Sequence, residues 1–383
     1  MASNSANGSA VLPDSQSKRI AESLLEGSGI AFNGSNPWDI QVHDPAFFGK
    51  VIRGGSMALG ETYMEGLWDC EQIDEMIVRL LNHGLGDRAE SPLRRALYQL
   101  QSNFINLQSK TRAFIVGKQH YDLGNDLFER MLDSTMCYSC AYWKDTDDLH
   151  QAQLNKLDLA ARKLGLEPGM KVLDIGCGWG SFAYHAATHY GCEVTGITIS
   201  REQAEYARGR CKDLPVEIIL EDYRDLTGEY DRIVSIGMFE HVGHKNYRTY
   251  FEAAKKLLKP DGLFVLHTIG SNGTSIGADP WINKYIFPNG VLPSVVQIAR
   301  PTEDLFVMED WQNFGADYDR TLMAWYERFE RAWPDVKHNY NERTYRMFRY
   351  YLLICAGAFR ARDIQLWQVV FSNRRPGRYD APR

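Results

Sequence analysis

The sequence lacks a basic excess, since its 383 residues carry 43 Lys and Arg against 49 Asp and Glu, a formal net charge of −6. Proteins that bind nucleic acid through its phosphates usually show the opposite balance, so no nucleic-acid partner is expected. The chain also lacks an uninterrupted run of about eighteen apolar residues, which excludes a predicted membrane-spanning helix. Its start, MASNSANGSAVLPDSQS, has neither the basic nor the apolar region of a secretion signal. These absences predict a cytoplasmic protein.

Cysteine is too sparse and too scattered for a disulfide framework. There are seven cysteines, an odd number, which favours reduced thiols. Cys137 and Cys140 form a C-x-x-C pair, but no second pair completes a zinc site and no thioredoxin-like context surrounds them. We therefore predict no metal.

The chain divides into four predicted parts. Residues 1–16 are small and polar and are expected to be disordered. Residues 17–107 hold short apolar segments broken by glycine, ending in a helix over 93–107, and predict a small, mostly helical accessory domain. Residues 108–122 read as a polar, basic linker, and residues 123–383 as the catalytic domain. Two basic clusters suit anionic lipid headgroups or, equally well, a solvated surface: Lys110, Arg112 and Lys118 in the linker, and Arg374, Arg375 and Arg378 in the tail.

Helices and strands alternate in the predicted catalytic domain. Helices are predicted over 151–164, 181–189, 201–210 and 247–257, and strands over 171–175, 193–198, 216–220, 231–236 and 262–268. Such alternation predicts an α/β fold, a Rossmann-like parallel sheet covered on both faces. Beyond Pro280 the pattern becomes aromatic, with helices over 321–333 and 344–362 and a strand over 366–372. This segment is expected to form a helical, aromatic cap over the carboxyl edge of the sheet.

The stretch VLDIGCGWG, residues 172–180, is the strongest motif. A buried strand ends at Asp174 and runs into Gly176, Gly178 and Gly180, which allow close approach of a ligand to the backbone. A dinucleotide fingerprint would need a third glycine at position 181, which is Ser181. An acid followed by G-x-G-x-G instead resembles the cofactor loop of S-adenosylmethionine-dependent methyltransferases.

Further polar residues follow the other predicted strands. Thr198 and Gln203 follow the second strand, and Asp222, which suits an adenine amine, follows the third. Glu240, with His241 beside it, and His267 follow the last two strands. Because carboxyl ends of parallel strands share one edge, we expect Glu240 and His267 beside the cofactor.

The methyl acceptor leaves a weaker signal. The Asn/Asp-Pro-Pro-aromatic signature of DNA N-methylation is missing, whereas a protein or small amine leaves no signal that excludes it. The cap is rich in aromatic residues, which a hydrophobic core explains for the most part. A pocket for an acyl chain, or one that stabilises a carbocation, explains the same residues: Tyr285, Phe287, Phe306, Trp311, Phe314, Tyr318, Trp325 and Tyr326.

Eight segments carry a specific resemblance. They are GKQHYDLGNDLFERML, MCYSCAYWKD, VLDIGCGWG, SIGMFEHVG, LHTIGS, DPWINKYIFPNG, FGADYDRTLMAWYERF and CAGAFRARDIQLWQVVFS. Together they resemble the bacterial cyclopropane-fatty-acyl-phospholipid synthases from about Ser17 onward. The resemblance implies methyl transfer from S-adenosylmethionine to the cis double bond of an unsaturated acyl chain in a membrane phospholipid. Deprotonation by a bound bicarbonate then closes the cyclopropane ring.

The resemblance also implies roles for single residues. Bicarbonate would be held by the side chains of Glu240, His267 and Tyr318 and the backbones of Cys140 and Ile269. The cofactor would be contacted by Tyr138, Ser139, Gly176, Gly178, Thr198, Gln203, Asp222 and Tyr223. Cys355 matches a cysteine assigned as catalytic in the family, but its apolar setting, YYLLICAGAF, favours a protonated thiol that packs or lines a pocket. Family membership further implies a homodimer at the inner face of the cell membrane.

Two competing hypotheses remain. A related enzyme quenches the same cation into a methyl-branched or methylene product, but a substitution near Glu240 would then be expected, and none is found. A catalytically silent lipid-binding protein is the other alternative. The intact set of Glu240, His267 and Tyr318 disfavours it.

Overall fold

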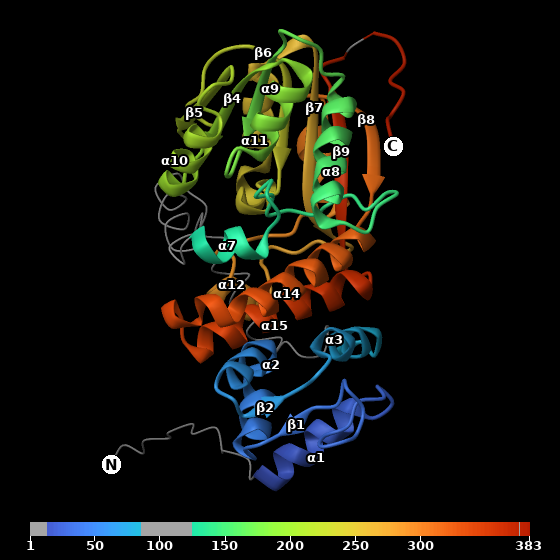
Figure 1. The fold of residues 1–383 in the computed structure, drawn as a ribbon. Helices are drawn as coiled ribbons and strands as arrows, with labels where there is room; N and C mark the ends of the chain where they lie inside the picture. Colours follow the sequence, from blue (N-terminus) through green and yellow to red (C-terminus); the bar gives the residue numbers. More distant parts are fainter. Residues whose placement is uncertain (1–13, 86–124, 375) are drawn as a thin grey trace, which may run out of the picture.

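A computed structural model describes residues 14–85, 125–374 and 376–383 (Figure 1). The first helix, α1 (Asp14–Leu25), begins within the N-terminal segment predicted to be disordered, so residues 14–16 are helical instead. The remainder of that segment, the predicted helix over 93–107 and the linker over 108–122 lie outside the described residues. The same holds for Arg375.

The N-terminal unit is mostly helical, as predicted for its described part. It contains α1, α2 (Ala46–Met64), α3 (Ile73–Asn82) and the short antiparallel strands β1 (Gln41–Val42) and β2 (Trp68–Asp69). Helix α2 kinks at Gly55, where φ is +58°, a value that glycine adopts without strain. The unit's own apolar residues, among them Phe47, Tyr63 and Trp68, are almost fully buried.

A seven-stranded sheet forms the centre of the larger unit, in the order β5-β4-β3-β6-β7-β9-β8. The strands are β3 (Lys171–Ile175), β4 (Glu193–Thr198), β5 (Val216–Leu220), β6 (Tyr230–Ile236), β7 (Leu258–Ser271), β8 (Val307–Asn313) and β9 (Ile364–Ser372). Strands β5, β4, β3, β6 and β7 are parallel, as predicted. Strands β7 and β9 pair antiparallel, as do β8 and β9, because the chain returns through the cap before adding its last strands.

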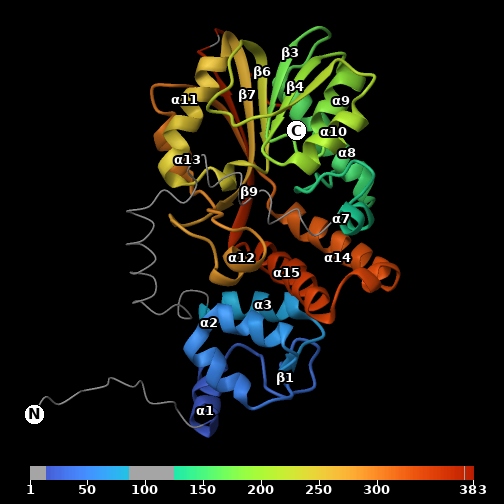
Figure 2. The same cartoon turned by 90° about the vertical axis from the view of Figure 1, so that its left-hand side faces the viewer.

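Helices cover both faces of this sheet, as the alternation predicted (Figure 2). Helices α8 (Leu149–Leu164), α9 (Ser181–Tyr190) and α10 (Arg201–Arg210) lie on one side, and α11 (Tyr247–Leu257) and α13 (Val295–Thr302) on the other. Val172 packs toward α8 and α9, while its neighbour Leu173 packs toward α11, since successive strand residues face opposite sides. Every element predicted between residues 151 and 268 occurs within four residues of its expected bounds.

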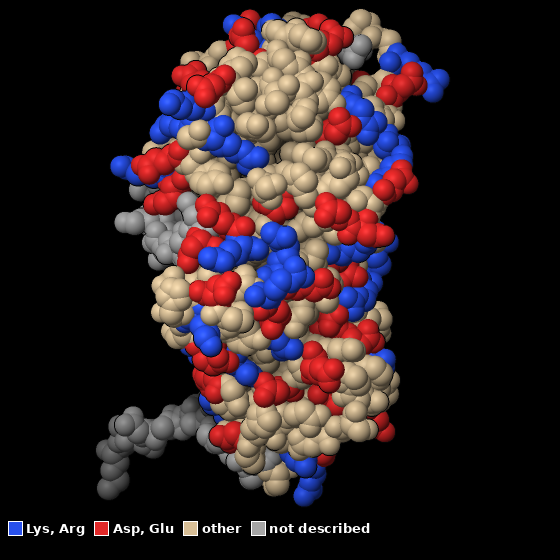
Figure 3. Space-filling model, viewed as in Figure 1, with Lys and Arg blue, Asp and Glu red and all other residues tan. Residues whose placement is uncertain are grey.

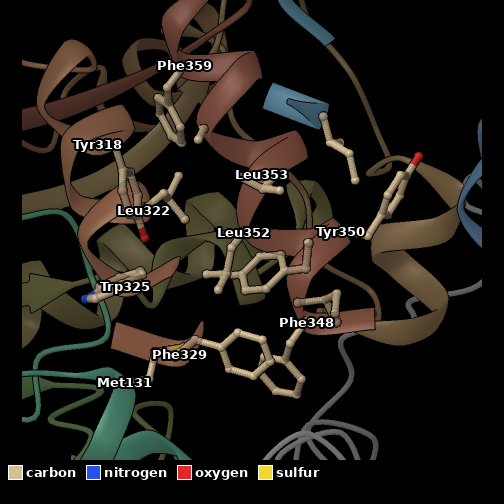
Figure 4. Packing of buried hydrophobic residues seen from close by; sticks show 14 of the residues in the cluster. Met131, Tyr318, Leu322, Trp325, Phe329, Phe348, Tyr350, Leu352, Leu353 and Phe359 are labelled. Atoms are coloured by element: carbon tan, nitrogen blue, oxygen red, sulfur yellow. The ribbon is translucent and has the colours of Figure 1, made fainter. Parts of the chain in front are cut away.

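Two long helices, α14 (Ala316–Val336) and α15 (Glu342–Arg360), form a layer between the sheet and the N-terminal unit (Figure 1). Tyr318, Leu322, Trp325 and Phe329 recur at helical spacing on α14 and pack against α15 (Figure 4). The smaller helices α7 (Asn125–Met131) and α12 (Pro280–Tyr285) lie beside this layer. The sequence pattern revealed α14, α15 and β9 but missed α12, α13 and β8.

Helix α15 also contacts the N-terminal unit. The rings of Tyr63 and Tyr350 stack with their centroids 5.4 Å apart. Arg360 donates to Asp74 of α3 and to Asp319 of α14, at 2.7 and 2.9 Å. One face of α15 thus contacts the N-terminal unit, and another packs against α14.

On the face shown in Figure 3, Lys and Arg side chains are interleaved with Asp and Glu and do not form a single basic patch.

Candidate active site

A cavity lies at the carboxyl edge of β3, β4, β5 and β6, where the sequence predicted the cofactor. Its lining contains nine of the ten residues predicted to contact the cofactor: Tyr138, Ser139, Asp174, Gly176, Gly178, Thr198, Gln203, Asp222 and Tyr223. The tenth, Gly180, does not line it. The sheet therefore brings together residues from four strand ends and from the 137–140 loop.

The glycine loop leaves room that side chains would fill. Gly176 has φ of +82°, and a Cβ built on it would lie 2.6 Å from the side chain of Met238. Gly180 also has a positive φ, +80°, but it precedes α9, and a Cβ there would lie 3.0 Å from the Cβ of Ala207. Gly176 thus shapes the cavity, whereas Gly180 allows α9 and α10 to approach each other.

Asp174 is the next-to-last residue of β3, and its carboxyl group is buried, with the residue 2% exposed. Burial raises the pKa of Asp174 to about 7, and the charge of nearby Lys156 acts in the opposite direction. A buried carboxylate beside a glycine loop is suited to a cationic or hydrogen-bond-donating part of a ligand.

The ends of β4 and β5 provide the remaining polar groups. Thr198 Oγ1 donates to Gln203 Oε1 over 3.1 Å, so a hydroxyl and an amide occupy the place where nucleoside sites usually hold an acid. Arg224 binds both carboxylate oxygens of Asp222, at 2.7 and 2.6 Å. The positive charge of Arg224 balances the negative charge of Asp222, and Arg224 also lines the cavity. The sequence analysis missed Arg224.

The loop that carries Tyr138, Ser139 and Cys140 is held from two sides. From α8, Gln153 Nε2 donates to the Ser139 carbonyl over 3.0 Å and Lys156 Nζ donates to Ser139 Oγ over 2.8 Å. From α15, Tyr351 accepts a hydrogen bond from the Tyr138 hydroxyl over 3.0 Å. Sequence reasoning missed Gln153, Lys156 and Tyr351, because no motif separates their side chains from ordinary helix residues.

Glu240 lies on a short 3₁₀ helix, Phe239–His241, directly after β6. Its Oε1 accepts a hydrogen bond from the Ile269 backbone N–H over 2.7 Å. Its Oε2 is buried and has no hydrogen-bond partner among the described residues. Burial raises the pKa of Glu240 to about 7, so the carboxyl group gains and loses its proton near neutrality.

His267 is fully buried on β7, and its ring has one satisfied nitrogen. Gln368 Nε2 on β9 donates to Nδ1 over 3.2 Å, since an amide nitrogen cannot accept. Burial, with the charges of Lys156 and Lys163, lowers the pKa of His267 well below its ordinary value. The ring is therefore neutral with its proton on Nε2, which finds no acceptor within the described residues.

None of the residues predicted to hold bicarbonate lines the cofactor cavity, a set that consists of Glu240, His267, Tyr318, Cys140 and Ile269. Burial raises the pKa of Tyr318 well above its ordinary value, and the neighbouring acidic groups of Cys140, Tyr138 and Glu240 act in the same direction. Its hydroxyl thus stays protonated and able to donate. Cys140 is fully buried, and burial also raises its pKa well above the ordinary value. The backbone of Ile269 was predicted to contact bicarbonate, and its N–H donates to Glu240 here.

Cys355 sits on α15, packed against the hydrophobic residues of the cap. Burial raises the pKa of its thiol to about 12, and Asp279 contributes in the same direction. A thiol that stays protonated is a poor nucleophile, so the structure gives no support to a covalent role.

Aromatic rings fill the space between the cofactor loop and the cap. The Tyr138 ring lies 5.2 Å from Trp325 and 6.3 Å from Phe287, and Phe287 lies 5.8 Å from Tyr351. Tyr318 meets Trp325 edge to face at 5.9 Å. Two cap aromatics belong elsewhere: Phe306 and Trp311 pack on the sheet against Phe371 and Trp367.

The glycine cradle, the polar strand ends and the sheet define an S-adenosylmethionine-dependent methyltransferase. Solved structures share this fold, among them coclaurine N-methyltransferase, which is 24% identical and covers 82% of this chain and 98% of its own, with a TM-score of 0.64. Residues 108–369 match the family described as mycolic acid cyclopropane synthetase. The chain belongs to this family of enzymes.

Individual relatives agree with this assignment. The cyclopropane-fatty-acyl-phospholipid synthase of Escherichia coli (strain K12) is 60% identical over 361 residues, 94% of each chain. A probable fatty acid methyltransferase of Pseudomonas putida is 34% identical, over 91% of this chain and 90% of its own. The cyclopropane synthase MmaA2 from Mycobacterium tuberculosis has a solved structure with a TM-score of 0.64 and 34% identity, covering 67% of this chain and 97% of its own. Within the described residues, no helix is long and apolar enough to cross a membrane.

Proposed function

We propose that the protein transfers the methyl group of S-adenosylmethionine to the cis double bond of an unsaturated acyl chain in a membrane phospholipid. The C–S bond of the sulfonium breaks as a C–C bond forms, and positive charge moves to the neighbouring carbon of the chain. Loss of a proton from the new methyl group closes the cyclopropane ring. The products are S-adenosylhomocysteine and a cyclopropane fatty acyl phospholipid.

An alkene is a weak nucleophile, so the residues around it must position the reactants and exclude water. The loop that carries Tyr138 and Ser139 is fixed by hydrogen bonds to α8 and α15. A fixed loop would hold the cofactor in one orientation toward the acyl chain. The faces of the Tyr138, Phe287 and Trp325 rings carry partial negative charge, which favours a carbocation. The rings also keep away water that would react with the cation. These residues favour formation of the cation and its survival until deprotonation.

We propose that a bicarbonate ion held by Glu240, His267 and Tyr318 would supply the base. One observation carries this proposal: Glu240 Oε2 and His267 Nε2 are both buried without a partner in the described part of the chain. Buried polar atoms are rarely left so, because an unmade hydrogen bond costs about 1–3 kcal/mol. Glu240 Oε2 would accept from the hydroxyl of the ion, while His267 Nε2 and the Tyr318 hydroxyl would donate to its oxygens.

The reaction is tested by incubating the purified protein with S-adenosylmethionine and vesicles of an unsaturated phospholipid. Mass spectrometry of the fatty acid methyl esters should show a gain of one methylene, and proton NMR should show ring methylene signals. Vesicles of the saturated phospholipid serve as the control. No mass gain contradicts the enzymatic function, and vinylic methylene signals in place of ring signals would assign a methylene product.

We also propose that the enzyme works as a homodimer bound peripherally to the inner face of the cell membrane. The E. coli relative, named for a phospholipid substrate, supports a membrane-surface location, and the resemblance of the family motifs supports the dimer. Sedimentation velocity of the full chain, and its flotation with anionic or neutral vesicles, test the two statements separately. A monomer contradicts the first, and failure to float with either vesicle contradicts the second.

A further inference from the structure

Helix α8 carries two lysines that are almost completely buried, Lys156 at 1% and Lys163 at 0% exposure. Lysine is rarely buried unless a negative group pairs with it. Lys163 has such a partner in Asp310, at 3.5 Å, and lies about two turns further along α8, where it does not line the cofactor cavity. Lys156 instead lines the cavity, seven residues earlier on the same helix.

Lys156 has only part of its hydrogen-bonding capacity satisfied by protein. An ammonium group has three donors, and in the described part of the chain Nζ makes one hydrogen bond, to Ser139 Oγ. Asp174 feels the charge of Lys156, which lowers its pKa against the effect of burial, but the two form no direct hydrogen bond. A buried cation with free donors thus borders the cavity.

The order of the strands explains which part of the cofactor this cation meets. Strands β5, β4 and β3 are neighbours, so Asp222, Thr198 and Asp174 stand in a row along the edge. At one end of the row Arg224 is already paired with Asp222. At the other end stand Lys156 and Asp174, a cation and an anion that match the carboxylate and ammonium of an amino acid.

We infer that Lys156 binds the carboxylate of the amino-acid part of S-adenosylmethionine while Asp174 faces its ammonium group. The hydrogen bond from Lys156 to Ser139 then fixes the 137–140 loop at the same time as it binds the cofactor. This inference rests on S-adenosylmethionine as methyl donor, but not on bicarbonate, the phospholipid or the cyclopropane product.

Two probes separate this role from a general effect on the cavity. S-Adenosylhomocysteine carries the amino-acid part, whereas 5′-methylthioadenosine has the same adenosine and sulfur without it. Titration calorimetry of Lys156→Met should show about 10- to 100-fold weaker binding of S-adenosylhomocysteine, the loss expected for a charge-assisted hydrogen bond. Binding of 5′-methylthioadenosine should change less than about twofold, and Lys156→Arg should restore part of the loss.

Lys163→Met is the matched control, since it removes an equally buried lysine from the same helix outside the cavity. It should leave the affinity for both probes unchanged, and thermal unfolding of each variant reports whether the fold persists. Equal losses for both probes in Lys156→Met, or no loss for either, would overturn the inference. The binding assay uses no lipid. The role of Lys156 can therefore be confirmed even if the protein forms no cyclopropane product.

Discussion

Gln368 Nε2 lies 3.2 Å from Nδ1 of His267, and both side chains are fully buried on neighbouring antiparallel strands. The amide therefore fixes the tautomer of the ring and leaves the proton on Nε2, facing the proposed bicarbonate. Gln368 is a positioning residue in this arrangement, since it acts through His267.

Gln368→Glu should reverse that tautomer. A carboxylate can only accept a hydrogen bond, so the ring would carry its proton on Nδ1. Nε2 would then be an acceptor and could no longer donate to an anion. We expect turnover to fall about 10- to 100-fold, the range found when an outer-shell partner is lost, with a higher KM for bicarbonate. Nitrogen-15 NMR of the histidine ring reports the tautomer directly. Gln365→Met, on the same strand but bonded to Arg362, should leave the His267 signal unchanged.

Glu240→Gln tests the base site itself. The amide keeps the shape of the side chain but removes the charge and the proton acceptor, so turnover should fall about 100-fold or more. The wild type should also slow in bicarbonate-depleted buffer and recover when bicarbonate is added. Glu252→Gln, at an exposed helix position, is the control. Indifference to both the substitution and the depletion would defeat the proposed base.

Two buried carboxyl groups predict a pH dependence of stability in the ligand-free protein. The pKa values of Asp174 and Glu240 are raised to about 7, so the folded state holds these protons more tightly than the unfolded state. The free energy of unfolding should therefore decrease as pH rises through the range from their ordinary values, 3.8 and 4.5, to about 7. The groups acting on them are Lys156 for Asp174 and the Ile269 N–H and Thr268 hydroxyl for Glu240.

Thermal unfolding between pH of about 5 and about 7 covers this range. Histidines with lowered pKa values raise stability over the same range, equally in the wild type and in a variant carrying both Asp174→Asn and Glu240→Gln. The stability of the wild type relative to this variant should therefore fall as pH rises, and parallel curves for the two proteins would contradict the assignment.

The two loop glycines should respond differently to alanine. In Gly176→Ala the new methyl group enters the space beside Met238 at the cavity, so the affinity for S-adenosylhomocysteine should fall at least about tenfold. In Gly180→Ala the strain falls on the contact between α9 and α10, so the melting temperature should fall while affinity changes less than about twofold. Calorimetry measures the affinity and thermal unfolding the melting temperature of both variants. The same pattern of change in both variants would contradict the prediction.

Cys355→Ser should retain substantial activity. The thiol is held protonated by burial, so replacing sulfur with oxygen removes no nucleophile and changes the packing of α15 only slightly. Turnover within about threefold of wild type is expected, measured with the vesicle assay and accompanied by a melting curve. Complete loss of activity in a folded protein would assign Cys355 a chemical role.

Local sequence pattern predicted much of the fold. The strands from β3 to β7 and the helices between them follow from apolar periodicity, and the glycine loop follows from its motif. Strand β8 was missed because none of its residues is fully buried and they carry no clear alternation. The antiparallel end of the sheet was missed because the direction in which β9 joins it depends on the path of the chain through the cap.

The sequence by itself determined which chemistry is available, since Asp174, Glu240 and His267 each lie in or just after a strand that the sequence predicts. Tertiary structure alone decided the partners of these groups. Gln368 reaches His267 across 101 residues, and Lys156 reaches Ser139 and the cavity from a helix without a motif. The pKa values near 7 of Asp174 and Glu240 also arise only in the folded chain, because burial removes the water that would otherwise stabilise their charges.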